Sequence, residues 1–219
     1  MGNDVIGILF KLVAEFTPYL FALCFHEYAH GWVAQKRGDN TAQMMGRLTM
    51  NPLAHADLLG TFVLPILAIL NPGGIFFGWA KPVPVNERNL KNPRTDMFWI
   101  ALAGPMSNII LAMISVVILM VSVRAFATTD YLQSIVVFFS RFIVVNISLA
   151  VFNSIPLHPL DGGKIIARFL PASINYKLEQ NEHMTSIVLL LIFLLPGARI
   201  ILAYPVRVLY ELFMSVASI

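Results

Sequence analysis

The sequence predicts an all-α, polytopic membrane protein, and three observations carry this prediction. First, 58% of the 219 residues are hydrophobic and only 12% are charged, whereas soluble domains are about 45–50% apolar and about a quarter charged. Second, apolar runs of helical length recur along the chain. Third, most basic residues lie in the linkers between these runs. We therefore expect a helical bundle of about five to six transmembrane segments, folded as a single membrane-embedded domain over residues 1–219.

The first apolar run predicts a helix over residues 5–34. It begins amphipathic, with Lys11 and Glu15, and becomes strongly apolar before it ends near Gly38-Asp39-Asn40. The first residues lack the basic region and the small-residue cleavage site of a secretory signal peptide. We therefore expect this first helix to be retained.

The next apolar run, at 58–70, is too short to cross a bilayer, which takes roughly 20 residues. It contains Pro65 and stops at an Asn-Pro-Gly-Gly turn, after which a second apolar stretch ends at residue 80. We interpret 58–80 as a re-entrant or broken hairpin.

Prolines then shape the segment that follows the hairpin. Pro82 and Pro84 favour extended over helical backbone. We expect a short extended or β segment near 71–90, to which an unwound substrate could add as a further strand.

Two clear spanning helices are predicted at 97–123 and 131–154. The second ends in a proline-rich break over 153–163, after which a short cationic helix is expected over about 164–170. A polar loop then leads to a final apolar helix pair within 184–217, divided by a Pro-Gly pair.

Loop charge predicts the orientation, because cytoplasmic linkers carry an excess of Lys and Arg. The linkers at 36–57, 81–96 and 160–183 hold most of the basic residues, whereas the linker at 124–130 holds only Arg124. All three basic linkers share one side only if 58–80 enters and leaves on that side. The N-terminus is then outside, and the polar end of the first helix faces the cytoplasm.

The most informative motif is His26-Glu27-Tyr28-Ala29-His30, an H-E-x-x-H sequence at the polar end of the first helix. Histidines at i and i+4 lie on one helix face and can bind one metal, and the glutamate can reach a water beside it. Ionisable residues after an apolar stretch are costly in a membrane and are usually functional. The alternative is a pair of ordinary histidines at a helix end.

A catalytic zinc site usually has three protein ligands, so two histidines need a distant partner. Asp161 is favoured because it follows a helix break that membranes tolerate only inside protein or beside a polar cavity. Asp161 could instead be the N-cap of the next helix, and spacing alone does not separate these roles. The candidates for the third ligand are His55, Asp57, His158, Asp161, Glu182 and His183.

Asn153 lies near the end of its predicted helix, where an asparagine is by default a C-terminal capping residue. Its amide could instead donate a hydrogen bond to a developing oxyanion. Cys24 is the single cysteine, so an internal disulfide is excluded. The net charge of +3 is spread over loops rather than one face, so no nucleic-acid partner is expected.

Five segments match, in order, the motifs of one protein family: His26-Glu27-Tyr28-Ala29-His30; Gly38-Asp39 through Gly46-Arg47-Leu48 to Asn51-Pro52-Leu53-Ala54-His55; Gly78-Trp79-Ala80-Lys81-Pro82-Val83-Pro84-Val85-Asn86; Ala103-Gly104-Pro105-Met106-Ser107-Asn108; and Phe152-Asn153-Ser154-Ile155-Pro156 with Pro159-Leu160-Asp161-Gly162-Gly163. The chain resembles the site-2 proteases, which are intramembrane zinc metalloproteases, and within them the compact bacterial subgroup without a PDZ or CBS domain. The motifs lie within roughly residues 20–170, inside an expected core of about 5–170.

The resemblance implies roles for individual residues. It implies that His26, His30 and Asp161 bind one Zn²⁺ per chain and that Glu27 is the catalytic base. Asn153 matches the asparagine that is thought to stabilise the reaction intermediate in this family.

Two further histidines, His55 and His158, lie outside this ligand set. A histidine recurs at the position of His55 in the compact subgroup, so His55 is a candidate for an additional metal or substrate contact. His158 lies where such sequences often have proline or a small residue, so it departs from the pattern.

The resemblance implies regulated intramembrane proteolysis, the hydrolysis of peptide bonds within or near transmembrane segments of membrane-protein substrates. The implied partners are single-span membrane proteins and the lipid bilayer of the bacterial inner membrane, and self-association into a homo-oligomer stays open. The alternative functions are a membrane metal-binding or transport protein and an inactive, protease-like binding module. A transporter would be expected to show an internal repeat, which is absent here, and the intact Glu27 argues against an inactive module.

Overall fold

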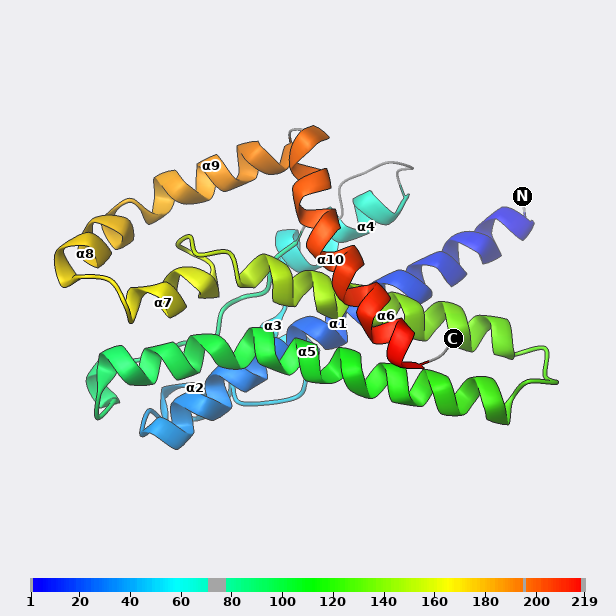
Figure 1. Ribbon diagram of the computed structural model, residues 1–219, viewed down its shortest axis with the longest axis horizontal. Coiled ribbons are helices and arrows are strands. Elements are labelled where there is room, and N and C mark those ends of the chain that lie inside the picture. Colours follow the sequence, from blue (N-terminus) through cyan, green and yellow to red (C-terminus); the bar gives the residue numbers. More distant parts are fainter. Residues whose placement is uncertain (1, 71–77, 195, 218–219) are drawn as a thin grey trace.

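The computed structural model describes residues 2–70, 78–194 and 196–217, which are helical with connecting loops (Figure 1). This confirms the all-helical class. The helices are α1 (Gly2–Arg37), α2 (Thr41–Met44), α3 (Pro52–His55), η1 (Leu58–Val63), α4 (Leu64–Leu70), η2 (Glu87–Asn89), α5 (Pro93–Ala125), α6 (Leu132–Asn153), α7 (Asp161–Ala167), α8 (Ala172–Gln180), α9 (Glu182–Leu194) and α10 (Pro196–Ala217).

Three helices form the centre of the molecule. α1, α5 and α6 pack on one another, and α1 and α6 run in the same direction with α5 antiparallel to both (Figure 1). Each of the three is long and apolar enough to cross a membrane, as residues 6–37, 93–125 and 132–153. The described part of the chain therefore shows three such helices, against the five to six predicted, and the other crossings remain a prediction.

The apolar core lies between α5 and α6. Buried side chains from the two helices meet there, and the inner face of α10 packs over them. Small residues allow this close approach, since Ala112 is fully buried beside Ile143 and Ile147. The core therefore holds α6 against α5, and the break after α6 leads to Asp161 at the start of α7.

The run at 58–70 forms a π-helix (η1) followed by one short α-helix (α4), and it is too short to span a bilayer. Asp57 begins it, because its carboxylate accepts hydrogen bonds from the backbone N–H groups of Leu59 and Gly60. The short length predicted for this run is confirmed, and the re-entrant or broken hairpin over 58–80 remains a prediction. The turn predicted at 71–74 lies outside the described residues.

Of the extended or β segment predicted near 71–90, the β alternative is wrong for the described part, which contains no strand. The reason lies in its hydrogen bonds. We call residues 78–86 the anchored segment, because its backbone bonds to helical residues and side chains instead of a neighbouring strand. The N–H of Trp79 donates to Gly60, that of Lys81 to His55, and that of Val83 to Glu27.

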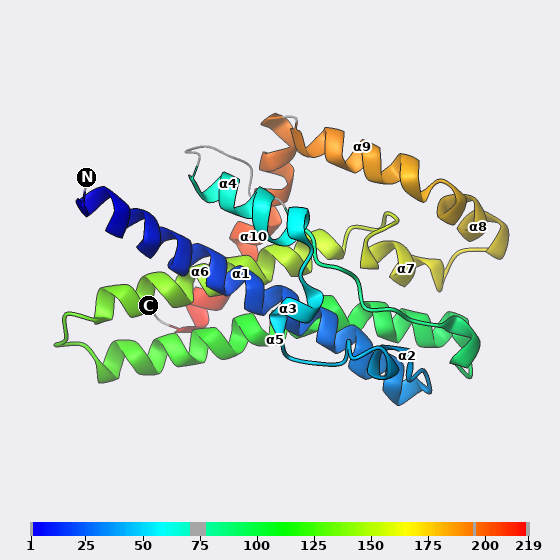
Figure 2. The ribbon, with the colours of Figure 1, turned by 180° about the vertical axis from the view of Figure 1, so that it is seen from behind.

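The C-terminal part contains one helix that we did not predict. The polar stretch before residue 183 forms α8, and the predicted helices at 164–170 and 184–217 correspond to α7, α9 and α10. α8 lies at one end of the molecule and leads into α9 (Figure 1). Seen from behind, α2 and α3 lie against α1 (Figure 2).

Candidate metal centre

His26 and His30 come from adjacent turns of α1 and face one another. Their Nε2 atoms are 3.1 Å apart and their rings are nearly perpendicular, at 86°. Both side chains are buried. The i, i+4 spacing therefore brings two imidazole nitrogens to one point, as the motif predicted.

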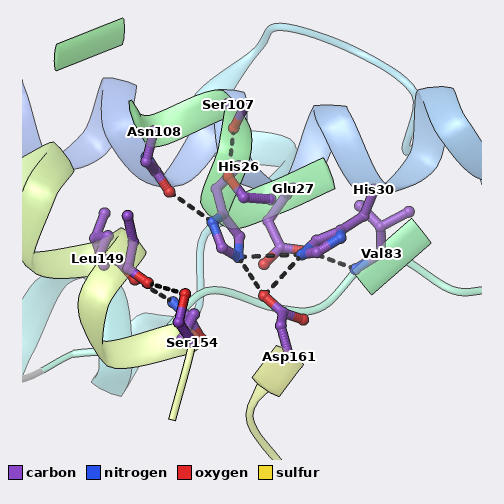
Figure 3. A network of polar contacts seen from close by, with 12 residues as sticks. His26, Glu27, His30, Val83, Ser107, Asn108, Leu149, Ser154 and Asp161 are labelled. Atoms are coloured by element: carbon purple, nitrogen blue, oxygen red, sulfur yellow. Dashed lines mark hydrogen bonds and ion pairs between the residues drawn. The ribbon is translucent and has the colours of Figure 1, made fainter. Parts of the chain in front are cut away.

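Asp161 approaches the same point from α7. Its Oδ2 atom is 3.0 Å from Nε2 of His26 and 3.2 Å from Nε2 of His30 (Figure 3). Asp161 is the first residue of α7, and Leu160 holds the N-cap position. The structure thus places the Asp161 carboxylate against the histidines, and Asp161 is not the N-cap residue.

Gly162 and Gly163 permit this placement, because α7 begins tightly against the loop that precedes it. A Cβ on Gly162 would lie 2.2 Å from the carbonyl oxygen of Ile155, and a Cβ on Gly163 would lie 2.6 Å from the backbone nitrogen of His158. Real Cβ atoms do not approach backbone so closely. The two glycines therefore let Asp161 reach α1.

The other ring nitrogens show which tautomer each histidine adopts. Nδ1 of His30 lies 2.7 Å from the carbonyl oxygen of Ile100, which can only accept, so this nitrogen carries the proton. Nδ1 of His26 lies 2.7 Å from Oδ1 of Asn108. The Asn108 amide is oriented by its own donors, because Nδ2 donates to the carbonyl of Ala22 and to Oδ1 of Asn146.

Both Nδ1 atoms therefore donate, and each Nε2 atom presents a lone pair when its ring is neutral, which is the form that binds a metal. In that form, two nitrogen lone pairs and a carboxylate oxygen lie within 4.8 Å of one another. Such a group of acceptors repels itself unless a cation lies between them. Two histidines and one carboxylate are a ligand set of catalytic zinc sites, so these residues fit a zinc ion.

Gly104 brings α5 against the two histidines. A Cβ on Gly104 would lie 2.4 Å from Nε2 of His30 and 2.6 Å from Cε1 of His26. Any larger residue at this position would therefore push into the rings. The Gly-Pro pair of α5 thus provides the space in which the metal ligands meet.

Glu27 lies beside the two histidine rings and is also buried (Figure 3). Its Oε2 atom accepts a hydrogen bond of 2.8 Å from the backbone N–H of Val83. The carboxylate is therefore held by the anchored segment. Because Val83 uses its N–H in this way and Pro82 and Pro84 have none, these three residues offer no free backbone donor to an added strand.

The other candidates for the third ligand lie elsewhere. Within the described residues, His26, His30 and Asp161 are the one cluster of three ligands that could hold a metal. Asp57 caps η1, and Glu182 and His183 are exposed at the start of α9. His158 is buried with Nε2 unpaired, outside the cluster.

His55 and Asn153 are both bonded to backbone. Nε2 of His55 lies 2.8 Å from the carbonyl oxygen of Thr49, and the structure does not bring its ring into the ligand cluster. Its Nδ1 is buried without a partner. The amide of Asn153 donates to the carbonyl of Leu149 in its own helix, at 3.1 Å.

Sequence reasoning missed the residue that orients His26. Asn108 matched a family motif but received no role. It is a fully buried residue of α5 that bonds to His26 and Ala22 of α1 and to Asn146 of α6. The available signal was an asparagine in the middle of an otherwise apolar spanning run, since a polar residue at that depth is costly and commonly functional.

Comparison with known proteins identifies the family. The model of Peptidase family M50 matches residues 17–135 and 120–196. The Bacillus subtilis (strain 168) protein named "Putative zinc metalloprotease YwhC" is 38% identical over 191 residues, which cover 86% of this chain and 80% of that protein.

Two mycobacterial relatives are more distant. "Putative zinc metalloprotease Rip2" of Mycolicibacterium smegmatis (strain ATCC 700084 / mc(2)155) is 29% identical over 160 residues, covering 72% of this chain but only 56% of that relative. The Mycobacterium tuberculosis (strain ATCC 25618 / H37Rv) protein of the same name is 28% identical over 193 residues, covering 87% of this chain and 69% of that protein. No solved structure matches the chain. The chain is a multi-pass membrane protein that belongs to peptidase family M50, the site-2 protease family of intramembrane zinc metalloproteases.

Proposed function

We propose that His26, His30 and Asp161 hold one zinc ion per chain and that Glu27 is the catalytic base for peptide-bond hydrolysis. The observation that carries this proposal is the convergence of three acceptor atoms from α1 and α7 at one buried point. Zinc supplies Lewis-acid chemistry, which polarises a carbonyl group and acidifies water.

Glu27 is positioned to move protons. Its carboxylate accepts the proton of the attacking water and returns that proton to the leaving amine, so that one water adds across one peptide bond. The hydrogen bond from Val83 fixes one carboxylate oxygen and leaves the second oxygen available. Because Glu27 is buried beside the two histidines, its carboxylate lies next to the proposed zinc site.

Asn153 is proposed to stabilise the negatively charged oxygen that develops on the attacked carbonyl. In the structure its amide donates to the Leu149 carbonyl. To serve the oxyanion, the side chain must exchange that intrahelical bond for a bond to substrate. We propose that His55 contacts substrate rather than metal, since its Nε2 is bonded to Thr49 while its Nδ1 still lacks a partner.

The proposed substrates are single-span membrane proteins whose helices unwind locally, because an intact helix has its amides bonded internally. We propose that the N-terminus lies outside a bacterial inner membrane and the site toward the cytoplasm. The parallel course of α1 and α6 supports a common side for their site-bearing ends (Figure 1), and the basic linkers assign that side to the cytoplasm. We propose that α9 and α10 make the remaining crossings and that 58–80 is a re-entrant or broken hairpin, within a single domain over 1–219.

Single cysteines test the orientation. With Cys24 replaced by serine, a cysteine at position 92 should react with an impermeant thiol reagent from the cytoplasmic side and one at 128 from the opposite side. Reaction of both positions from one side would contradict the proposed topology.

The Glu27→Gln variant tests the assignment of the base. It keeps an oxygen that can accept from Val83 but cannot take a proton, so zinc content should stay at the wild-type level. Cleavage of single-span membrane proteins in proteoliposomes should fall by about 10²–10⁴-fold. Glu179→Gln, at an exposed position on α8, is the control and should cleave normally. Wild-type cleavage by Glu27→Gln would contradict the proposal.

A further inference from the structure

Arg47 is a buried arginine outside the proposed catalytic machinery. It follows α2 and a turn at Gly46, whose φ of +65° suits glycine, and only 9% of its surface is exposed. The ion pairs found among the described residues do not include it, and its Nε is buried without a partner. A buried guanidinium without a counter-ion is costly, so its contacts need an explanation.

The side-chain hydrogen bonds of Arg47 both go to the anchored segment. Nη2 donates to the carbonyl oxygen of Lys81 at 2.7 Å and to that of Pro82 at 3.4 Å. The first bond is strong and charge-assisted, and the second is at the limit of a hydrogen bond. Arg47 therefore binds two consecutive carbonyls directly before Val83.

The peptide unit between Pro82 and Val83 joins Arg47 to Glu27. This unit is planar, with the Pro82 carbonyl on one side and the Val83 N–H on the other. Arg47 approaches the carbonyl side, and the Glu27 carboxylate accepts from the N–H side at 2.8 Å. A rotation of this plane would turn the N–H away from the carboxylate.

The neighbouring residues cannot replace this N–H. Pro82 and Pro84 have no backbone donor, so Val83 offers the single N–H of residues 82–84. The side chain of Val83 is buried, which limits movement of the plane toward solvent. The bond from Arg47 to Lys81 fixes the preceding peptide unit as well.

We propose that Arg47 is a positioning residue that aligns the Glu27 carboxylate through the peptide units of residues 81–83. The proposal rests on the proposed role of Glu27 as catalytic base. A misaligned base lowers the rate of the chemical step, and a displacement of about 1 Å can cost about 10²-fold in rate. Zinc binding should not change, because Arg47 contacts none of the three ligands.

Arg47→Met tests the proposal, because methionine keeps an apolar stem and loses every donor. We expect kcat to fall by about 10–100-fold, with KM within about threefold of wild type and unchanged zinc content. Arg47→Lys keeps one charged donor that can reach the Lys81 carbonyl, so it should recover much of kcat. Should the methionine variant fail to fold, Arg47→Lys and Arg47→Gln are compared with wild type by the same criteria.

Asp39→Asn is the matched control. The Asp39 carboxylate accepts from the N–H of Asn86 at 2.7 Å and so holds the far end of the anchored segment without touching the 82–83 peptide. If Arg47 only stabilises the segment, an Asp39→Asn variant that loses as much thermal stability as Arg47→Met should also lose as much kcat. That result, a loss expressed in KM, a loss of zinc, or no advantage of Arg47→Lys over Arg47→Met would overturn the inference.

The Glu27→Gln variant, measured in the same series, separates the two proposals. If Glu27→Gln cleaves normally, the proposed base is wrong. If Glu27→Gln is inactive while Arg47→Met keeps wild-type kcat, the base stands and the positioning role of Arg47 is refuted.

Discussion

Replacing Asn108 with alanine should weaken zinc binding although Asn108 touches no metal. Its Oδ1 is the acceptor for Nδ1 of His26, and this contact both orients the ring and keeps the proton off Nε2. Both side chains are buried, with exposures of 0% for Asn108 and 4% for His26. In Asn108→Ala the Nδ1–H of His26 loses the acceptor that it has in the structure.

General free energies of hydrogen bonds and of metal sites bound the expected loss of zinc affinity. A buried donor left without a partner costs about 1–3 kcal/mol. Loss of the group that orients a metal-binding histidine typically costs about 10–100-fold in metal affinity, or about 1.4–2.7 kcal/mol. Side-chain hydrogen bonds between membrane helices average only about 0.6 kcal/mol, which favours the lower end. We therefore expect a loss of about tenfold.

The assay is competition for zinc between the purified protein in detergent and a chelator of known affinity. Ser115→Ala is the control, since Ser115 is a buried polar residue of the same helix whose hydroxyl donates only to the Leu111 carbonyl. The control should bind zinc as wild type does. Zinc affinity of Asn108→Ala within about twofold of wild type would refute the reasoning that this amide sets the tautomer of His26.

Three further predictions concern the surroundings of the site. Gly104→Ala should abolish zinc binding in the chelator assay, because its Cβ would lie 2.4 Å from Nε2 of His30. Gly7→Ala, which has open space around it, is the control and should bind zinc normally. Zinc binding by Gly104→Ala would contradict the packing of α5 against the histidines. His55→Gln should retain full zinc content by mass spectrometry, and a loss would make His55 a ligand. For Asp39, burial alone would raise the pKa of the carboxyl, but hydrogen bonds hold that pKa below its usual range. The ionised carboxylate therefore stabilises the fold fully above the unfolded pKa of about 3.9. This stabilisation is lost as the pH falls through the lower folded pKa. The thermal stability gap between wild type and Asp39→Asn should be full at pH 7 and close in strong acid, and a gap independent of pH would refute this.

Much of the fold was predictable, because spanning helices leave strong periodic and compositional signals. The first helix, the two helices that became α5 and α6, and the broken run at 58–70 all correspond to apolar runs bounded by Gly, Pro or charge. α8 was not predicted, because its polar sequence carries no apolar run.

The site was predictable where the ligands are close in sequence and less so where they are not. The spacing of His26 and His30 is a local property of one helix, whereas Asp161 is brought to them by the packing of α5, α6 and α7 and by two glycines. The bond from Val83 to Glu27 could not be predicted, since it depends on the path of an irregular segment. For the same reason the segment was expected to pair as a strand, although its N–H groups are used by the backbone of α3 and η1 and by side-chain acceptors.

The zinc content of the Asp161→Ala variant tests the central claim most directly. Purified wild-type protein should contain one zinc per chain, and Asp161→Ala should lose it, because two histidines alone leave the site without its third ligand. Asp57→Ala removes a carboxylate that caps η1 instead and should keep the zinc. Asp161→Ala protein that binds zinc with wild-type affinity would contradict the proposed centre.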